Sequence, residues 1–325
     1  MPILFLLFSC IWSLSLQGTA QPQFFSIFGL AQNGSRMLSA SPAGETDQAA
    51  WSTFLWDDAT IGGRKYSRAA LLIPVRVPEQ RRVGYLQLDL GASTVFYTTP
   101  YSEFVPGHSL AASPTFTGRI AGHEVQDYPI RLEDVHRQTG APADRWVIGT
   151  LGMDFFAFHS LVIDFPNRRL LILDYEEVPE THIHDSMMFS EGNYRDDKFF
   201  VALSIAGKPY KDGFFFDTGS SLFPLIVSPP LWHTLTGRTG NETANIRMDI
   251  DSWEKKVTVV GAPVRGSIEI AGAVYRDQLV FYTPHGEFDF AKADPRIIGL
   301  FGNALFYDRM VLVDPYRRRF GVSRQ

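Results

Sequence analysis

The sequence predicts a mostly β protein made of two similar lobes, and three observations carry this prediction. Short apolar or alternating runs, bounded by Gly, Pro and Asp turns, recur along the chain. Long segments with the 3.6-residue period of a helix are scarce. The chain also contains an internal repeat, and its 325 residues suit two lobes of roughly 100–200 residues each.

Composition narrows the class of protein further. Hydrophobic residues make up 45% and charged residues 20% of the chain, which excludes a largely disordered protein. The net charge is −5, and no basic run of five or more residues occurs, so we expect no nucleic-acid partner. Aromatic residues stand at 14%, which suits the core of a β protein.

Residues 1–20 are predicted to be a signal peptide. Residues 2–16 form an uncharged apolar run that is too short to span a membrane, and Gly18-Thr19-Ala20 offers small residues for cleavage. We therefore expect an exported protein, secreted or periplasmic, without a membrane span. The alternative is a lipoprotein, because residues 7–10 loosely resemble a lipobox that would anchor the chain through Cys10.

Cysteine usage excludes several kinds of chemistry. Cys10 is the only cysteine, so cleavage after Ala20 would leave none in the mature chain. A thiol nucleophile, a cysteine-ligated zinc and a disulfide framework are then excluded.

The rest of the chain changes character at Lys65, where the first clear strands begin. We predict an N-terminal extension at residues 21–64, an N-terminal lobe at 65–178, a connector at 179–196 and a C-terminal lobe at 197–325.

The internal repeat is the most informative feature. Residues 147–156 can be laid over 297–306, and 161–169 over 311–319, both at an offset of 150 residues. Upstream, an apolar strand followed by Asp-Leu-Gly at residues 86–93 matches an apolar strand followed by Asp-Thr-Gly at 214–221, at an offset of 128. The difference of 22 residues predicts an insertion in the second copy, around residues 234–253. A third match, of 116–120 with 264–268, falls between these two, so the order of the motifs is conserved between the copies.

These motifs resemble the pepsin-like, two-lobed aspartic proteases over about residues 65–325, and each half resembles the single-lobe retropepsins. The resemblance implies an all-β acid-protease fold and an aspartic endopeptidase that binds a peptide or protein substrate between its lobes. It requires no cofactor and no metal, and we favour a monomer. The site residues that it implies are the catalytic pair Asp89 and Asp217, the supporting residues Gly91, Ser93, Thr218, Gly219 and Ser220, and a flap over the substrate at Phe116, Thr117 and Gly118.

The chemistry of such a site explains its residue types. Two carboxylates in contact cannot both ionise cheaply, so the pair holds one proton over a range of pH. One carboxylate then acts as a general base on a water molecule, and the other protonates the carbonyl oxygen of the peptide bond. The glycine after each aspartate lets the backbones of the two turns approach closely. In the family, the apolar-apolar-Gly segments at 147–149 and 297–299 would support the turns from behind.

The two copies differ at two positions next to the aspartates. The family usually has Thr or Ser after each aspartate, with a hydroxyl that bonds across to the other lobe; Thr218 fits this pattern, and Leu90 does not. Ser220 can donate to Asp217, whereas the matching residue Ala92 cannot. We therefore expect Asp217 to ionise more readily and Asp89 to hold the shared proton. The predicted flap also lacks the Tyr that the family commonly has.

Other functions remain as alternatives. The runner-up is a catalytically weak or inactive protein of the same fold that binds peptides or glycans or inhibits another protein, which Leu90 and the missing flap Tyr favour. A carbohydrate-binding β-sandwich would leave the duplicated aspartates unexplained. A metal site at residues 182–185 is the weaker interpretation of His182-Ile183-His184-Asp185, which we assign to a polar connector. We interpret Asp154, Asp164 and Asp314 as turn or solvated carboxylates.

Overall fold

The structure is a computed structural model, and it describes the greater part of the chain after residue 50. The described residues are 51–78, 80–105, 114–134, 145–183, 185–240, 242, 245–252, 255–286 and 290–324. The predicted signal peptide, Cys10, residues 21–50 of the predicted extension and His184 lie outside the described residues. Within the described part of the chain, none of the helices has the length and apolar character needed to cross a membrane.

Within the described residues, the first half of the chain supplies eleven strands. They are β1 (Ser52–Thr53), β2 (Leu55–Ile61), β3 (Arg64–Arg76), β4 (Gly84–Leu88), β5 (Val95–Tyr97), β6 (Thr115–Ile120), β7 (His123–Pro129), β8 (Leu132–Glu133), β9 (Trp146–Leu151), β10 (His159–Asp164) and β11 (Arg169–Asp174). The helical segments of this half are α1 (Thr98–Phe104) and the 3-10 turns η1 (Phe155–Phe158) and η2 (Pro179–Thr181).

The second half supplies the remaining elements. Its strands are β12 (Met187–Arg195), β13 (Lys198–Val201), β14 (Leu203–Ile205), β15 (Lys208–Tyr210), β16 (Phe214–Phe216), β17 (Leu225–Val227), β18 (Ile246–Ser252), β19 (Lys255–Pro263), β20 (Ser267–Ile270), β21 (Ala273–Arg276), β22 (Leu279–Tyr282), β23 (Gly299–Phe301), β24 (Met310–Asp314) and β25 (Arg319–Ser323). Its helical segments are η3 (Thr218–Ser220), α2 (Pro229–Thr236), α3 (Phe290–Ala293) and η4 (Asn303–Leu305). The fold is therefore mostly β, as the sequence predicts.

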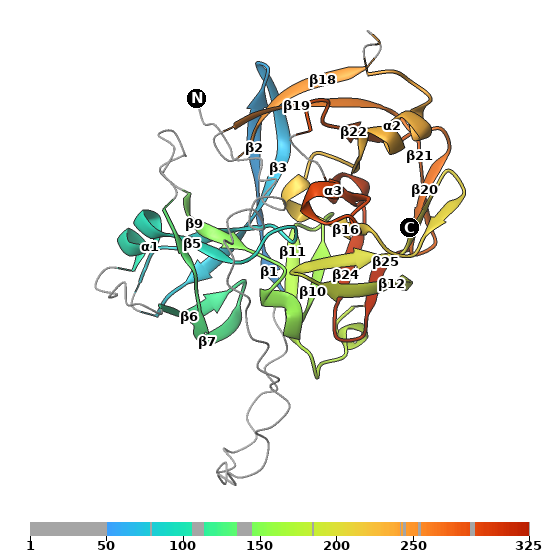
Figure 1. Ribbon diagram of the computed structural model, residues 1–325. Coiled ribbons are helices and arrows are strands. Elements are labelled where there is room, and N and C mark those ends of the chain that lie inside the picture. Colours follow the sequence, from blue (N-terminus) through green and yellow to red (C-terminus); the bar gives the residue numbers. More distant parts are fainter. Residues whose placement is uncertain are drawn as a thin grey trace.

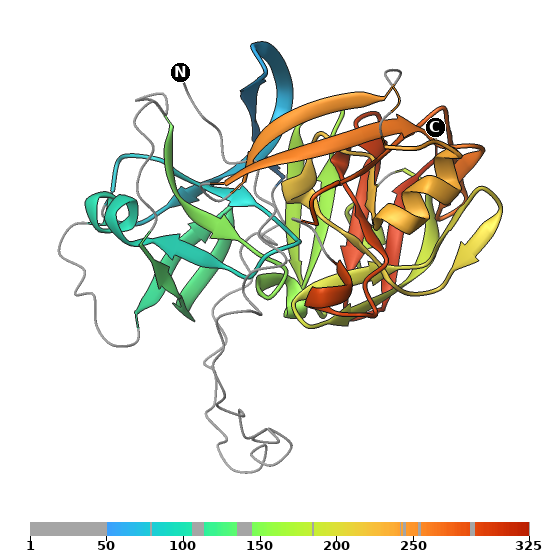
Figure 2. The same cartoon turned by 45° about the horizontal axis from the view of Figure 1, so that its top comes forward.

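The strands form two lobes on either side of a central sheet (Figures 1 and 2). One lobe contains an eight-stranded sheet with the strand order β7-β6-β3-β4-β9-β5-β8, and β2 pairs with β3. The other lobe contains a four-stranded sheet, β15-β14-β20-β21, and the β13-to-β18 part of a thirteen-stranded sheet. The rest of that large sheet, β1-β11-β10-β24-β25-β12, joins strands from both halves of the chain.

The repeat in the sequence is also a repeat in strand pairing. In the first lobe β4 runs parallel to β9, and β5 pairs with β9 in the antiparallel sense. In the second lobe β16 runs parallel to β23, and β17 pairs with β23 in the antiparallel sense. Each lobe thus threads one central strand between the strand that precedes the aspartate and the strand that follows it.

Strands β10 and β24 of the large central sheet meet across a pseudo-two-fold axis. They pair in the antiparallel sense, with Val162 opposite Leu312 and Leu161 opposite Val313. At the offset of 150 residues, Leu312 is the repeat equivalent of Val162, so these two equivalent positions face each other. The axis that relates the two halves therefore passes close to this pair.

Apolar side chains fill both lobes and the space around the aspartate-bearing strands. Residues 69–73 of β3 are each at most 1% exposed, and so are the three phenylalanines of β16. The ring of Phe216 contacts three other phenylalanine rings at centroid distances of 5.3 to 5.6 Å, those of Phe301, Phe306 and Phe320. The strand before Asp217 is thus held on several sides by close-packed rings.

A buried ion pair is repeated at the ends of β10 and β24. Asp164 ends β10 and Asp314 ends β24, and they are 2% and 0% exposed. Asp164 accepts from Arg169 Nε at 2.8 Å, and Asp314 accepts from Arg319 Nε at 2.9 Å. Both are turn carboxylates, as expected, because Asp164 accepts from Asn167 N and Asp314 accepts from Arg317 N, but neither is solvated.

One expected lobe boundary divides a pair of strands. The boundary at residue 64 divides the hairpin of β2 and β3, which pair from Leu55–Leu72 to Ile61–Arg64. The expected connector, residues 179–196, contains η2 and all of β12, and β12 pairs with β25 in the central sheet. The hairpin of β18 and β19 lies partly in the segment where the offsets predict an insertion.

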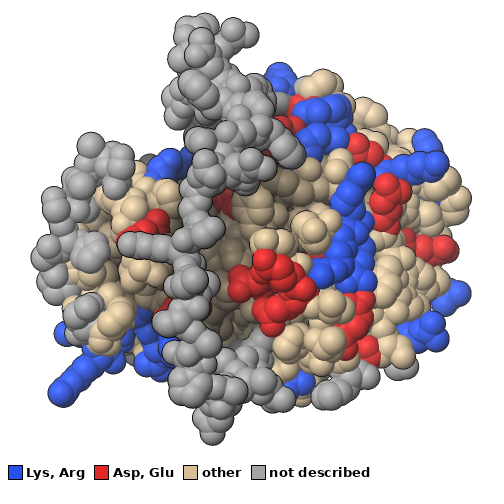
Figure 3. Space-filling view, turned by 90° about the horizontal axis from the view of Figure 1, so that it is seen from below, with Lys and Arg blue, Asp and Glu red and all other residues tan. Residues whose placement is uncertain are grey.

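Charges of both signs lie close together on the surface. On the face seen in Figure 3, acidic residues gather in one patch beside a stripe of Lys and Arg, and neither sign dominates the face.

Candidate functional site

Two aspartates lie at equivalent turns between the lobes. Asp89 follows β4 and Asp217 follows β16, and both are 0% exposed. Each backbone N–H donates 3.0 Å to a carbonyl of the central strand of its own lobe, Asp89 to Leu151 and Asp217 to Phe301. Because Phe301 is the repeat equivalent of Leu151, the two turns are fixed to their lobes in the same way.

Each carboxylate is held by the glycine that follows it. Gly91 N donates to Asp89 Oδ1 at 3.1 Å, and Gly219 N donates to Asp217 Oδ1 at 2.9 Å. These bonds orient both carboxylates along their turns. Backbone N–H donors of this kind also favour the charged form of a carboxylate.

The two turns are in direct contact. A Cβ atom added to Gly219 would lie 2.5 Å from Asp89 Cγ and 2.6 Å from both of its carboxylate oxygens. Carbon atoms in van der Waals contact are about 3.5–4.0 Å apart, so only glycine fits against this carboxylate. The carboxylate of Asp89 therefore packs on the backbone of the Asp217 turn.

A second pair of glycines supports the turns from behind. A Cβ on Gly152 would overlap the carbonyl oxygen of Ala92, and a Cβ on Gly302 would overlap that of Ser220. We expected the segment that ends at Gly149 to support the Asp89 turn. Gly149 instead packs on the backbone of Val95, which lies in β5 after the turn. The supporting glycine lies three residues further along, because the parallel register of β4 and β9 brings Leu88 opposite Leu151.

Thr218 is the hydroxyl bridge between the lobes. Its Oγ1 accepts from Leu90 N at 3.0 Å and donates to Leu88 O at 2.9 Å, with all groups buried. The equivalent residue in the first lobe is Leu90, whose fully buried side chain has no hydroxyl to return the bond. The bridge is therefore built from one side.

The second lobe also supplies a hydroxyl to its own aspartate. Ser220 Oγ donates to Asp217 Oδ2 at 2.7 Å, whereas the matching residue in the first lobe is Ala92. Burial raises the pKa of Asp217 above its usual value, and the Ser220 hydroxyl, a hydrogen bond from Asp89 and the N–H groups of Gly219 and Ser220 oppose that rise. A hydrogen bond between two carboxyl groups requires a proton on one of them, so this arrangement suits a pair that holds one proton.

The remaining supporting residue, Ser93, lies at a contact between the lobes. Its Oγ donates to Asp197 Oδ2 at 3.2 Å, and Asp197 Oδ1 accepts from Tyr194 at 2.7 Å. Asp197 lies in the turn between β12 and β13, so this hairpin reaches the Asp89 turn from the second lobe. Ser93 therefore connects the lobes rather than contacting a carboxylate of the pair.

The expected flap residues lie in strand β6. Phe116 is 1% exposed, and its ring packs on that of Phe96 with a centroid distance of 5.4 Å. Gly118 lies against the carbonyl of Arg76 on β3, and Thr117 faces solvent, where it bonds Asp127. The structure thus brings together Asp89, Asp217 and their glycine and hydroxyl partners, but it places Phe116 in the core of the lobe.

The sequence analysis missed Tyr97, a buried tyrosine at the end of β5, the strand that follows the Asp89 turn. Its hydroxyl lies 3.0 Å from Thr150 Oγ1, and burial raises its pKa to about 12. The sequence gives little indication of this position, because its pattern predicts Tyr97 only as the last apolar residue of a short strand.

A separate group of residues has the donor atoms for a metal ion. His123, His159 and Asp174 offer atoms that lie within 4.8 Å of one another. Burial and the neighbouring His159 lower the pKa of His123, which favours its neutral form. By contrast, His182, which the sequence analysis weighed as a ligand, lies 3.3 Å from Glu177 Oε1.

Comparisons with known proteins give structural likeness only at low identity. No protein-family description and no curated protein matches the chain. Similar solved structures include conglutin gamma, a basic 7S globulin from lupine seeds, with 10% identity, 86% of this chain and 96% of that chain covered, and a TM-score of 0.43. The basic 7S globulin from soybean is 11% identical, with 85% of this chain and 96% of the globulin covered and a TM-score of 0.42. An aspartic proteinase from Irpex lacteus is 11% identical, with 78% of this chain and 93% of the proteinase covered and a TM-score of 0.39.

The class of fold is given by the strand pairing itself. Two equivalent units, each a strand, an Asp-Gly turn and a threaded central strand, meet across one pseudo-two-fold axis. This arrangement is a pepsin-like, two-lobed all-β fold.

Proposed function

We propose that this protein is an aspartic endopeptidase that hydrolyses peptide bonds between its two lobes. The observation that carries the proposal is the packing of the Asp89 carboxylate on Gly219, which brings two buried aspartates together at equivalent turns. A fold alone does not define an activity, so the proposal depends on the chemistry of these two side chains.

The asymmetry of the pair supports placing the proton of the resting enzyme on Asp89. Asp217 accepts from Ser220 Oγ and Gly219 N, whereas the first lobe has Ala92 in the place of Ser220, and a hydroxyl donor favours the charged form of a carboxylate. Asp217 is then the general base that takes a proton from a water molecule bound between the carboxylates. Asp89 is the general acid that gives its proton to the carbonyl oxygen of the scissile bond. The proton taken by Asp217 next passes to the amide nitrogen as the C–N bond breaks, and a proton returns to Asp89 from the collapsing tetrahedral intermediate.

The test is cleavage of a mixed peptide library by the purified protein from about pH 3 to pH 8. Asp89→Asn and Asp217→Asn should each abolish turnover, and a statine-type transition-state inhibitor should block the wild type. The matched control is Asp277→Asn, because Asp277 is exposed and lies at a positive φ of 55° that Asn also adopts. Retained cleavage in the Asp217→Asn variant would refute the mechanism.

A second candidate is a protein of the same fold that binds peptides or glycans, or inhibits another protein, without turnover. The buried side chain of Leu90 favours it, because one half of the hydroxyl bridge is missing. In this case the folded wild type cleaves no peptide at any pH. Peptides selected from the same library would then be retained by the wild type, and Gly219→Ala would reduce that retention.

Export remains part of the proposal. Residues 1–20 would be removed as a signal peptide, leaving a monomeric exported chain that begins at Gln21. The N-terminal residue of the protein recovered outside the cell decides this point. A lipid-modified Cys10 at the N-terminus would instead establish the lipoprotein alternative.

A further inference from the structure

We propose that His123, His159 and Asp174 form a binding site for one divalent transition-metal ion, with zinc as the ion that fits the donor set. This site is separate from the aspartate pair, and the inference does not depend on the proposed peptidase activity.

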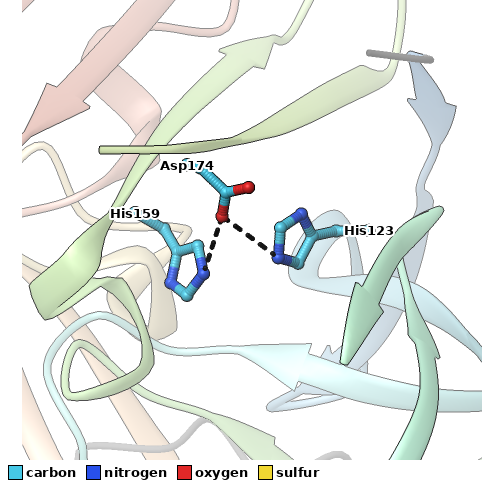
Figure 4. A group of neighbouring side chains, drawn as sticks. All are labelled: His123, His159 and Asp174. Atoms are coloured by element: carbon cyan, nitrogen blue, oxygen red, sulfur yellow. Dashed lines mark ion pairs between the residues drawn. The ribbon is translucent and has the colours of Figure 1, made fainter. Parts of the chain in front are cut away.

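The three side chains converge on one point, as Figure 4 shows. His159 Nε2 lies 3.5 Å from Asp174 Oδ1, and His123 Nε2 lies 3.9 Å from the same oxygen. A tetrahedral zinc ion with bonds of about 2.0–2.1 Å holds its ligand atoms about 3.3 Å apart. The present spacing therefore needs only small side-chain rotations to reach a bound geometry.

The tautomer of His159 points its lone pair at the proposed site. His159 Nδ1 lies 2.9 Å from the carbonyl oxygen of Phe155. A carbonyl oxygen only accepts, so Nδ1 carries the hydrogen and Nε2 of the neutral ring carries the lone pair. That lone pair faces a carboxylate oxygen, and two acceptors face each other favourably only with a cation or a proton between them. Metal-bound histidines are commonly oriented by this type of bond to a backbone carbonyl.

Strand register holds the ligands in place. His159 on β10 is directly opposite Asp174 on β11, so both side chains project from the same face of the hairpin. His123 begins β7, on the other side of the site. The ring of Phe155 stacks on that of His159 at 4.9 Å and meets the edge of His123 at 6.4 Å, which restricts the rotation of both histidines.

The donor atoms and the exposure of the site favour zinc. Two imidazoles and one carboxylate suit zinc and similar transition ions, whereas calcium and magnesium prefer oxygen donors alone. The Asp174 side chain is 56% exposed, so an ion can enter from solvent and a water molecule can complete the coordination. The bound ion would join the turn before β7 to the hairpin of β10 and β11.

The test is equilibrium dialysis of the tag-free, metal-stripped protein against zinc, with thermal unfolding as a second measurement. We expect one zinc ion per chain and a melting temperature that rises with zinc concentration. Asp174→Asn should weaken binding at least about tenfold and remove the rise, because it deletes a charged ligand from an exposed position. His159→Asn should do the same, since an Asn side chain can still donate to Phe155 O but has no atom in the place of Nε2. Cobalt in place of zinc should give the visible absorption of a tetrahedral ion.

The matched control is His233→Gln, because His233 is exposed on α2, away from this group. The control should bind zinc as the wild type does. Absence of stoichiometric zinc binding by the wild type would overturn the proposal, and so would equal losses in Asp174→Asn and His233→Gln.

Discussion

Thr218→Val should destabilise the protein by about 2–4 kcal/mol, although it keeps the size of the side chain. The variant removes the hydroxyl that accepts from Leu90 N and donates to Leu88 O across the lobes. A buried N–H left without an acceptor costs about 1–3 kcal/mol, and the lost bond to Leu88 adds about 0.5–1.5 kcal/mol. The first lobe has Leu90 at the equivalent position, so it supplies no hydroxyl to replace the lost one.

The assay is urea unfolding followed by tryptophan fluorescence. The transition midpoint should fall while the dependence of the unfolding free energy on urea stays unchanged, which marks a loss of stability rather than a change in compactness. Thr234→Val is the matched control, because the exposed Thr234 hydroxyl bonds only to Pro230 O within α2, and its effect should be below about 0.5 kcal/mol. A Thr218→Val effect as small as that of the control would refute the reasoning.

Three further predictions concern the aspartate pair. Gly219→Ala should push the Asp89 carboxylate away by about 1 Å, which should lower kcat about 100-fold and reduce stability by about 1–3 kcal/mol. Unchanged kinetics would show that the two turns are not in contact. Ser220→Ala should move the acidic limb of the kcat/KM profile to higher pH, because the hydroxyl opposes the rise in the pKa of Asp217, and an unmoved limb would contradict that role. Since burial raises the pKa of Asp217 above its usual value, folding binds the proton of the pair more tightly, and this contribution to stability is present at low pH and lost as pH rises through the folded pKa. Asp217→Asn should therefore flatten the fall in unfolding free energy above about pH 4, and an equal slope in both proteins would argue against a raised pKa.

The fold and the partners of the aspartates were predictable because their causes are local in the sequence. An apolar strand that ends in Asp-x-Gly specifies both a buried carboxylate and a glycine that permits close approach, and two copies imply two such turns. The hydroxyl bridge was also predictable in part, since Thr218 and Leu90 differ in the chemistry of their side chains. These features need no knowledge of how distant strands are aligned.

The predictions for the supporting glycine and for the flap were wrong for different reasons. Gly149 lies within β9 and Gly152 directly follows it, and only the register of β4 against β9 decides that Gly152 meets the Asp89 turn. The placement of Phe116 was open to correction from sequence, because Phe116, Gly118 and Ile120 alternate with polar residues, and this alternation points them into the core. The three residues of the proposed metal site are far apart in the chain, so their sequence spacing carries no signal.

The pairing of β10 with β24 across the pseudo-two-fold axis has a consequence for how the site can evolve. Two separate but identical chains meeting across such an axis would carry the same turn on both sides, and any substitution would appear twice. Here one gene encodes both halves, so each turn is inherited and altered independently. The substitutions that distinguish Leu90 from Thr218 and Ala92 from Ser220 are available only to the fused form. A single chain thus allows the two carboxylates to have different neighbours before any ligand arrives.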